Sequence, residues 1–144
     1  TLFFAGNDTS SILLSMVMWS IAQDPAIQQE CATEAKDAST TKPSSNERGL
    51  DEDASQWESR LAYCRAVILE TLRLHPPAYM NCRVFNKDVE LDGYTIPKRT
   101  RVYIPVIQVH ADERNFARAA EFLPERWVRR DADGRGWVAR DRRT

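Results

Sequence analysis

A strong charge of one sign and paired cysteines are both missing from this sequence. Its 144 residues carry a formal net charge of -1 and a sequence pI near 6.1, so no global basic field exists to hold nucleic-acid phosphates. The three cysteines are an odd number without C-x-x-C spacing, which argues against a disulfide scaffold and a zinc ribbon. The chain does contain 42% hydrophobic and 28% charged residues, enough for the core of one ordinary domain.

A long hydrophobic run free of polar residues is also missing. Residues 2–22 are mostly apolar and about as long as a bilayer span, but they include Asn7, Asp8 and several serines. No basic region precedes them, which argues against a signal peptide. A buried core helix is therefore favoured, with any membrane anchor outside this chain. The start at Thr1 and the end without a cap or polar tail predict a piece of a longer protein.

The first part of the chain predicts two helices and an insertion. Residues 3–22 should form a long helix that is buried nearly all round, because it has few polar faces. Asp24 followed by Pro25 is typical of a helix start, and a second helix is expected over 25–38. Its apolar stripe is expected to contain Ile27, Cys31 and Ala35. Residues 39–54 are rich in Ser, Thr, Asp and Glu and predict a flexible surface insertion.

A third helix is expected over residues 55–74. Ser55 and Glu58 have the spacing of a capping box at its start. The Pro76–Pro77 pair should end it, because proline cannot donate a backbone hydrogen bond and disfavours helix in the preceding residue. The apolar positions at helical spacing are Leu61, Cys64, Ile68 and Leu72.

Beyond the proline pair the hydrophobic period changes from that of a helix to that of a strand. Asp92–Gly93 lies at the centre of the alternating segment 89–96 and predicts a two-residue β-hairpin. Another strand is expected within 101–109, limited by Pro105. The tail from Ala111 onward should be irregular coil held by aromatic side chains. Helices, then a small antiparallel sheet, then coil predict a mainly α fold of the α+β class.

The segment AGNDTS at residues 5–10 breaks the rules of an apolar helix. Glycine costs about 1 kcal/mol in a helix interior, and Asn, Asp and Thr compete with the backbone for hydrogen bonds. One interpretation is a bent helix whose free carbonyl and hydroxyl hold a small ligand or water. The other is a helix that starts here, with Asp8 or Thr9 as its N-cap.

Two further motifs carry charge. Glu70 and Arg73 lie three residues apart on one helix face and can pair. Their apolar neighbours indicate burial, and a buried pair needs further partners. In the segment FLPERW at 122–127, Arg126 is either a solvated arginine in a proline turn or an arginine that reaches back to complete the pair.

Together the three motifs resemble the C-terminal half of a cytochrome P450, a haem-thiolate monooxygenase. Residues 5–10 are similar to the family's oxygen-binding motif A/G-G-x-D/E-T-T/S, residues 70–73 to its E-x-x-R motif, and residues 124–127 to its P-E-R-F motif with tryptophan in place of phenylalanine. The segments similar to the family's helix end and hairpin are 74–77 and 92–98. The expected partial domain, 1–144, consists of two helices (1–38), the insertion (39–54), the E-x-x-R helix (55–75), a hairpin region (76–110) and a meander coil (111–144).

The resemblance implies roles for the first motif. Gly6 would give dioxygen room over the haem face, and Ala5 would border the substrate. Thr9 would hydrogen-bond the oxygen or its water, while Asp8 would feed protons. A hydroxyl next to a carboxylate is a reasonable proton relay in a dry pocket.

The resemblance also implies that Glu70, Arg73 and Arg126 form a structural charge cluster that serves folding and haem incorporation. A guanidinium bound to a carboxylate suits a buried lock between helix and coil. Arg83 matches a basic residue that pairs with a haem propionate, the alternative being an ordinary exposed strand arginine. His110 matches a structural histidine of the family and not an iron ligand.

The main departure from the family concerns the ligand of the iron. In the family a cysteine thiolate in a loop F-x-x-G-x-R-x-C-x-G holds it, and this sequence ends before any such loop. Cys31, Cys64 and Cys82 lie in other contexts, so no metal ligand is assigned here. Haem is expected as the cofactor of the full-length protein, and the 144 residues alone are expected to be inactive. Their apolar surface should form a large exposed patch, with marginal stability or aggregation.

The implied parent protein activates dioxygen at haem iron and inserts one oxygen atom into a small apolar organic substrate. Electrons would come from an NADPH-dependent reductase or another donor, and no nucleic acid is expected as a partner. The acidic, Ser-rich insertion is compatible with a eukaryotic protein tethered to the endoplasmic reticulum membrane by an anchor outside this chain. Two rival hypotheses stay open: a non-catalytic truncated relic, and a helical interaction module without haem, which predicts that Glu70, Arg73 and Arg126 are separately exposed.

Overall fold

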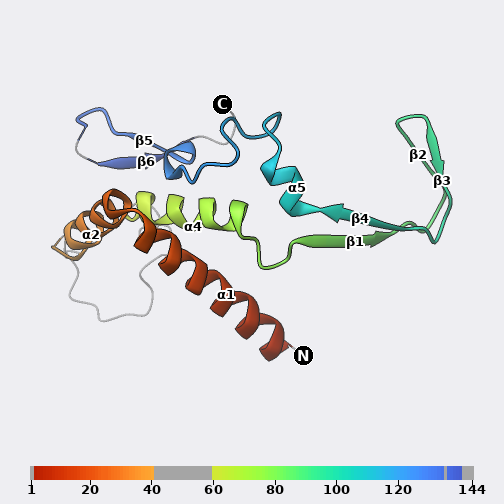
Figure 1. Cartoon of the computed structure of the whole chain (residues 1–144), viewed down its shortest axis with the longest axis horizontal. Helices are drawn as coiled ribbons and strands as arrows, with labels where there is room; N and C mark the ends of the chain where they lie inside the picture. Colours follow the sequence, from red (N-terminus) through yellow and green to blue (C-terminus); the bar gives the residue numbers. More distant parts are fainter. Residues whose placement is uncertain (1, 41–59, 135, 141–144) are drawn as a thin grey trace, which may run out of the picture.

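The chain forms a mainly helical fragment around one central helix, α4 (Ala62–Leu74). The structure is a computed structural model that describes residues 2–40, 60–134 and 136–140. Figure 1 shows α4 between α1 (Leu2–Gln23) on one side and the β5–β6 hairpin on the other. The other elements are α2 (Pro25–Thr40), β1 (Met80–Val84), β2 (Val89–Leu91), β3 (Tyr94–Ile96), β4 (Arg101–Pro105), α5 (Val106–Ala111), the 3-10 helix η1 (Pro124–Arg126), β5 (Val128–Arg130) and β6 (Trp137–Ala139). Small antiparallel sheets beside the helices confirm the predicted α+β class.

The core gathers along one face of α4, and this face differs from the predicted one. Among the described residues the main buried cluster consists of Val17, Ile27, Ala62, Tyr63, Ala66, Val67 and Val128. Of the predicted stripe, Ile68 is 40% exposed. The buried face continues instead into Glu70, whose side chain is drawn inward by hydrogen bonds. The predicted stripe was wrong here because it followed the apolar side chains alone, whereas the buried face also contains Glu70, Thr71 and Arg73.

Helix α4 begins at Ala62, directly after a turn at Leu61. The predicted helix start at residue 55 lies outside the described residues. The predicted capping box, Ser55 and Glu58, and most of the predicted insertion lie outside the described residues.

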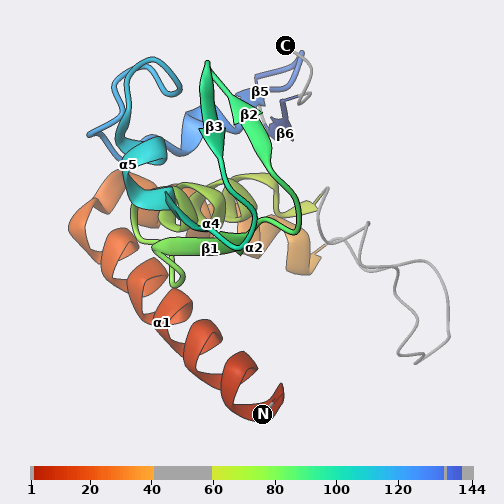
Figure 2. The same cartoon turned by 90° about the vertical axis from the view of Figure 1, so that its right-hand side faces the viewer.

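Helix α1 is much more exposed than predicted. Phe3, Phe4 and Leu14 are 80%, 72% and 64% exposed, and among its described side chains only Val17 and Ser20 are buried. The reason is visible in Figure 2, where the N-terminal half of α1 extends away from the other elements and only its C-terminal half reaches them. The expected large apolar patch is therefore present. Across the described parts of the chain, no helix is long and apolar enough to cross a membrane.

Helix α2 begins as the sequence predicts. The Asp24 carboxylate accepts hydrogen bonds from the backbone N–H groups of Ala26 and Ile27, at 2.8 and 3.4 Å, which is the N-cap arrangement. Of the predicted apolar stripe, Ile27 is buried but Ala35 is exposed. Ala38, which the prediction did not include, is buried instead. The helix continues two residues beyond the predicted end, to Thr40.

The predicted hairpin is confirmed in both position and turn. Leu91 pairs with Tyr94 across Asp92–Gly93, whose φ angles of 50° and 80° are those of a type I′ turn. This hairpin lies at the far end of the antiparallel β1–β4 pair in Figure 1. Strand β4 ends at Pro105, as predicted.

Several elements after Pro105 were not predicted. The short helix α5 continues directly from β4, and β5 pairs with β6 within the expected coil. Strand β5 contains Arg129 and Arg130, so its sequence shows no apolar alternation that indicates a strand.

Candidate functional site

The centre of the candidate site is the carboxylate of Glu70, which is completely buried in α4. Its Oε1 accepts hydrogen bonds from Arg73 Nη2 at 2.8 Å, and from Arg126 Nε and the Leu123 backbone N–H at 3.0 Å each. Its Oε2 accepts from Arg73 Nε at 3.0 Å and from Trp127 Nε1 at 2.9 Å. Five donors therefore converge on one carboxylate, which compensates for the loss of its hydration.

Arg73 is buried beside it, and all of its donor nitrogens are used. Besides its two bonds to Glu70, Arg73 Nη1 donates to the backbone oxygens of His110 and Ala119, and Nη2 donates to that of Glu121. These three contacts are 2.8 to 2.9 Å long. A guanidinium has five N–H groups, so the charge is fully hydrogen-bonded. Arg73 thus fastens α4 to α5 and to the segment that follows it.

Arg126 folds back from η1 to meet this pair. Besides its bond to Glu70, it donates to the backbone oxygens of Ala117 and Arg118, and its side chain is 15% exposed. The structure therefore brings Glu70, Arg73 and Arg126 together. The hypothesis of a helical interaction module predicted that the three side chains are separately exposed, and these ion pairs contradict it.

Two donors in the cluster were missed from the sequence. One is the Trp127 indole, whose position was noted only as a departure from the family's phenylalanine; its N–H group was the signal that could have identified it. The other is the backbone N–H of Leu123, for which a sequence carries no signal.

The environment of Glu70 favours its charged form. Burial raises the pKa of Glu70. The hydrogen bonds from Arg73, from the Leu123 N–H and from Trp127 lower this pKa by more than burial raises it. The result is a pKa below the ordinary 4.5. The carboxylate is therefore ionised at neutral pH and pairs with two guanidinium groups.

His110 is bound to the same cluster and not to any metal-ligand set. Its Nδ1 lies 3.0 Å from the Arg73 backbone oxygen, while its own carbonyl accepts from Arg73 Nη1. The ring also packs edge-on against Phe116 at 5.8 Å. Across the described ranges, no group of three or more His, Cys, Asp or Glu side chains is placed to hold a metal ion.

The first motif lies elsewhere, on the exposed part of α1. The helix runs without interruption from Leu2, so neither Asp8 nor Thr9 is an N-cap. Thr9 Oγ1 donates to the Ala5 carbonyl oxygen at 2.8 Å, and Asp8 Oδ1 accepts from the Asn7 amide at 3.4 Å. The hydroxyl is thus bonded to its own helix and not to the neighbouring carboxylate.

Gly6 and Arg83 both face open space. A Cβ atom built on Gly6 would meet no neighbouring atom within 4 Å among the described residues. Arg83 is exposed on β1, and its Nη1 donates a hydrogen bond to the Cys82 carbonyl oxygen at 3.0 Å. Its guanidinium therefore keeps donors for an anionic group.

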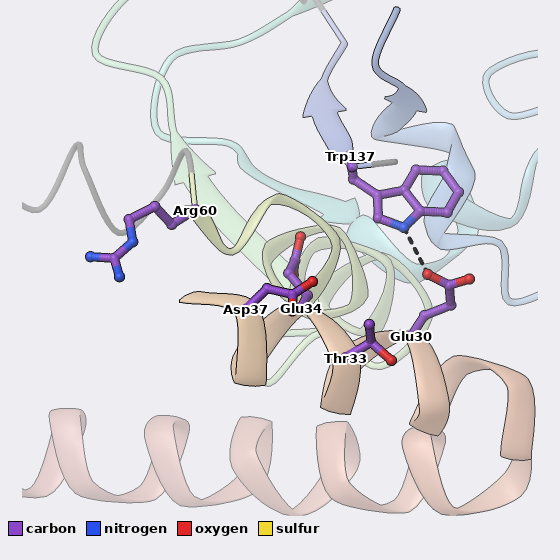
Figure 3. Close-up of a pocket in the computed structure, with 7 residues that line it drawn as sticks. Glu30, Thr33, Glu34, Asp37, Arg60 and Trp137 are labelled. Carbon is purple, nitrogen blue, oxygen red and sulfur yellow. Dashed lines mark hydrogen bonds between the residues drawn. The ribbon is translucent and has the colours of Figure 1, made fainter. Parts of the chain in front are cut away.

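A second polar region lies between α2 and β6 (Figure 3), in a pocket of about 210 Å³. Its acidic residues are already engaged. Glu30 accepts from Trp137 Nε1 at 3.0 Å and from Arg130 at 2.8 Å. Glu34 accepts from the backbone N–H groups of Tyr63 and Cys64, at 2.8 Å each, and so caps the start of α4. These hydrogen bonds hold α2 to β6 and to the start of α4.

Comparison with known proteins identifies similar sequences over nearly the whole chain. The model of the family described as cytochrome P450 matches residues 1–138. Probable cytochrome P450 12c1, mitochondrial, of Drosophila melanogaster is 36% identical over 95% of this chain and 25% of its own length. Cytochrome P450 27C1 of Danio rerio is 35% identical over 93% and 23%, and human cytochrome P450 3A7 is 35% identical over 90% and 24%. The chain spans about a quarter of the length of these relatives.

Proposed function

The chain belongs to the cytochrome P450 family, and from this premise we propose that the full-length protein inserts one oxygen atom from dioxygen into a small apolar organic substrate. The observation that carries the proposal is the family match over residues 1–138. The buried Glu70 cluster supports it, because two of the three motifs that carried the resemblance, residues 70–73 and 124–127, meet there in space.

Haem, when bound, supplies the iron at which dioxygen is activated. Two features of the described residues fit such a group. The exposed Arg83 guanidinium offers charged donors to a propionate, which suits its planar fork. The open space over Gly6 on α1 allows a flat ring and a small ligand to approach the helix backbone closely. Arg83 would therefore hold a propionate and Ala5–Gly6 would face the reacting side.

Thr9 and Asp8 are proposed to bring protons to that side. Because the Thr9 hydroxyl donates to the Ala5 carbonyl, its lone pairs are free to accept a hydrogen bond from a water. Such a water would be oriented by Thr9 and resupplied with protons through the exposed Asp8 carboxyl. In this arrangement Thr9 positions the proton donor and Asp8 connects it to solvent.

The role proposed for Glu70, Arg73 and Arg126 is to hold together the elements that would surround the haem. The cluster joins α4 to α5, η1 and the segment between them. Removing one partner of a buried ion pair costs about 3–5 kcal/mol, because the other charge is left uncompensated. Loss of any of the three should therefore reduce haem incorporation through misfolding and not through slower chemistry.

Electrons are proposed to come from a redox partner. We propose that this partner is an NADPH-dependent reductase. Localisation is proposed as membrane-associated. The Drosophila relative carries "mitochondrial" in its name, so the proposal covers the mitochondrion as well as the endoplasmic reticulum.

The test is an oxygen-labelling experiment on the full-length protein with haem, reductase, NADPH and ¹⁸O₂. A panel of fluorogenic aryl alkyl ethers serves as probe substrates, because oxygen insertion beside the ether oxygen releases the fluorophore. We expect one ¹⁸O atom in the carbonyl product, and about 10²-fold less product per NADPH in Thr9→Ala. Thr9→Ser keeps the hydroxyl and should stay close to wild type. Absence of dioxygen consumption by the reduced, haem-loaded protein would contradict the proposal.

A further inference from the structure

Two cysteines lie close together where α2 packs on the first turn of α4, away from the residues used by the proposed function. Cys31 lies on α2 and Cys64 on α4, 33 positions later in the sequence. The Cys64 Sγ atom is 3.8 Å from the Cys31 carbonyl oxygen. All three cysteines of the chain are free thiols in the structure.

The backbone around this pair is held by the hydrogen bonds of Glu34 and by the packing of Tyr63. Both carboxylate oxygens of Glu34, one turn along α2 from Cys31, accept backbone N–H groups of α4, from Tyr63 and from Cys64 itself. Figure 3 shows Glu34 pointing from α2 toward α4. Tyr63 is 2% exposed and packs against Trp137 at 4.8 Å. The two helices therefore hold the Cys64 thiol beside the Cys31 backbone in a fixed arrangement.

The two thiols differ in acidity and remain within reach of small reagents. Both are half-buried, whereas Cys82 on β1 is exposed. Interaction with Cys64 lowers the pKa of Cys31, against burial and the charges of Glu34 and Glu30, which raise it. The same contact and burial raise the pKa of Cys64. A pair of accessible thiols can be oxidised in two steps, in which one sulfur reacts with the oxidant and the other sulfur resolves it.

We propose that Cys31 and Cys64 are an oxidisable pair that closes to a disulfide between α2 and α4 when hydrogen peroxide is the oxidant. The Cys31 thiolate attacks one peroxide oxygen, giving a sulfenic acid and hydroxide, which takes up a proton and becomes water. The Cys64 sulfur then attacks the sulfenic sulfur, losing its proton and releasing a second water. Two thiols lose two electrons and two protons in total, and one peroxide is reduced to two waters. The proposal is independent of haem binding.

The product is identified by peptide mapping of the full-length protein. After peroxide treatment and alkylation of the remaining thiols, tryptic cleavage at Arg60 and Arg65 releases LAYCR, and cleavage at Lys36 ends the peptide that carries Cys31. We expect these two peptides to be joined, two hydrogens lighter than their sum, and to separate after dithiothreitol. A map in which both thiols stay alkylated, or are oxidised to sulfinic or sulfonic acid without a linked peptide, would overturn the proposal.

Matched variants separate this pair from general thiol oxidation. Cys31→Ala and Cys64→Ala should each lose the linked peptide, whereas Cys82→Ala should keep it at the wild-type amount. Linkage of either helical cysteine to Cys82 at a higher yield than to its helical partner would also overturn the proposal. The map of the wild-type protein decides the matter even where an alanine variant does not fold.

Discussion

At the residue scale, a buried carboxylate is the feature on which the structure depends. Glu70 is fully buried, and such a group is stable only when hydrogen bonds and opposite charge replace its water. Arg73, Arg126 and Trp127 supply them from two separate parts of the chain. The carboxylate is thus a junction between the central helix and η1, and its neighbours can be tested singly.

Trp127→Phe keeps the ring that the family motif has and removes only the indole N–H. Because a hydrogen bond to a charged group contributes about 1.5–3 kcal/mol, we expect a loss of that size in the free energy of unfolding. Trp137→Phe is the matched control, since its N–H also donates to a carboxylate, but the Glu30 side chain is 37% exposed. Urea unfolding of the full-length variants measures both, and an equal loss in the two variants would refute the assignment.

Glu70 also predicts the dependence of stability on pH. Its pKa is lowered in the folded protein from the ordinary 4.5, so its contribution is complete above that value and is lost as the pH falls through the folded pKa. Glu70→Gln removes this contribution. We expect the wild-type advantage over Glu70→Gln to be constant near neutral pH and to shrink at acid pH. Unfolding free energies measured from pH 7 to pH 3 test it, and an advantage that grows toward acid would contradict it.

At the element scale, the two helix starts are capped in different ways. Helix α2 uses Asp24, the residue just before it, whereas α4 has no side-chain cap of its own and uses Glu34 from a neighbouring helix. A local cap stabilises one helix end, but the Glu34 cap also holds α2 against α4.

Removal of these caps should therefore have unequal effects. Asp24→Ala is expected to cost about 1 kcal/mol of unfolding free energy, as for an ordinary N-cap. Glu34→Ala breaks two charge-assisted hydrogen bonds to half-buried backbone and should cost about 2–3 kcal/mol. Glu34→Gln keeps one acceptor oxygen and should lie between them. Thermal and urea unfolding report the order, and a larger effect at Asp24 would show that the borrowed cap is unimportant.

Local signals in the sequence explain which elements were predicted. The Asp24–Pro25 helix start and the Asp92–Gly93 turn depend on residues next to each other in the chain, and both are confirmed. The Glu34 cap joins Glu34 to Tyr63 and Cys64, which lie 29 and 30 positions later in the chain, so its partners could not be predicted from local spacing. Strand β5 depends on its pairing with β6 and lacks a local pattern.

The candidate site could be predicted only as far as its motifs were chemically distinctive. Glu70 and Arg73 were identified from their spacing on one helix face and their apolar neighbours, whereas Arg126 was assigned to them through the resemblance of residues 124–127 to the P-E-R-F motif. The backbone acceptors at His110 and Ala119 carry no side-chain signal. The proton relay expected between Asp8 and Thr9 was not found as a direct contact, because a helical threonine bonds readily to the carbonyl four residues earlier.

At the scale of the whole molecule, α1 carries a large exposed apolar surface. Large exposed side chains follow it, namely Phe3, Phe4, Ile12, Leu14, Met18 and Trp19. A surface of this kind promotes association in water. The curated relatives are about four times as long as this chain, which leaves ample polypeptide to cover α1 in a full-length protein.

The 144-residue chain in isolation should therefore be marginally stable and self-associate. Sedimentation velocity over a range of concentrations should show species larger than the monomer. Replacing Phe3 and Phe4 by serine removes the two most exposed large rings of α1 and should reduce the association. A monomer with a sharp two-state melt would be the opposite result.

The role proposed for the Glu70 cluster is to hold together the elements that bind haem in the full-length protein. Its most direct test is the carbon monoxide spectrum of the reduced full-length protein, in wild type, Glu70→Gln and Glu121→Gln. Glu121 pairs with Arg118 at the surface and is the matched control. The account predicts the Soret band of thiolate-ligated haem in wild type and in Glu121→Gln, with most of it lost in Glu70→Gln. No such band in wild type, or a full band in Glu70→Gln, would contradict the account.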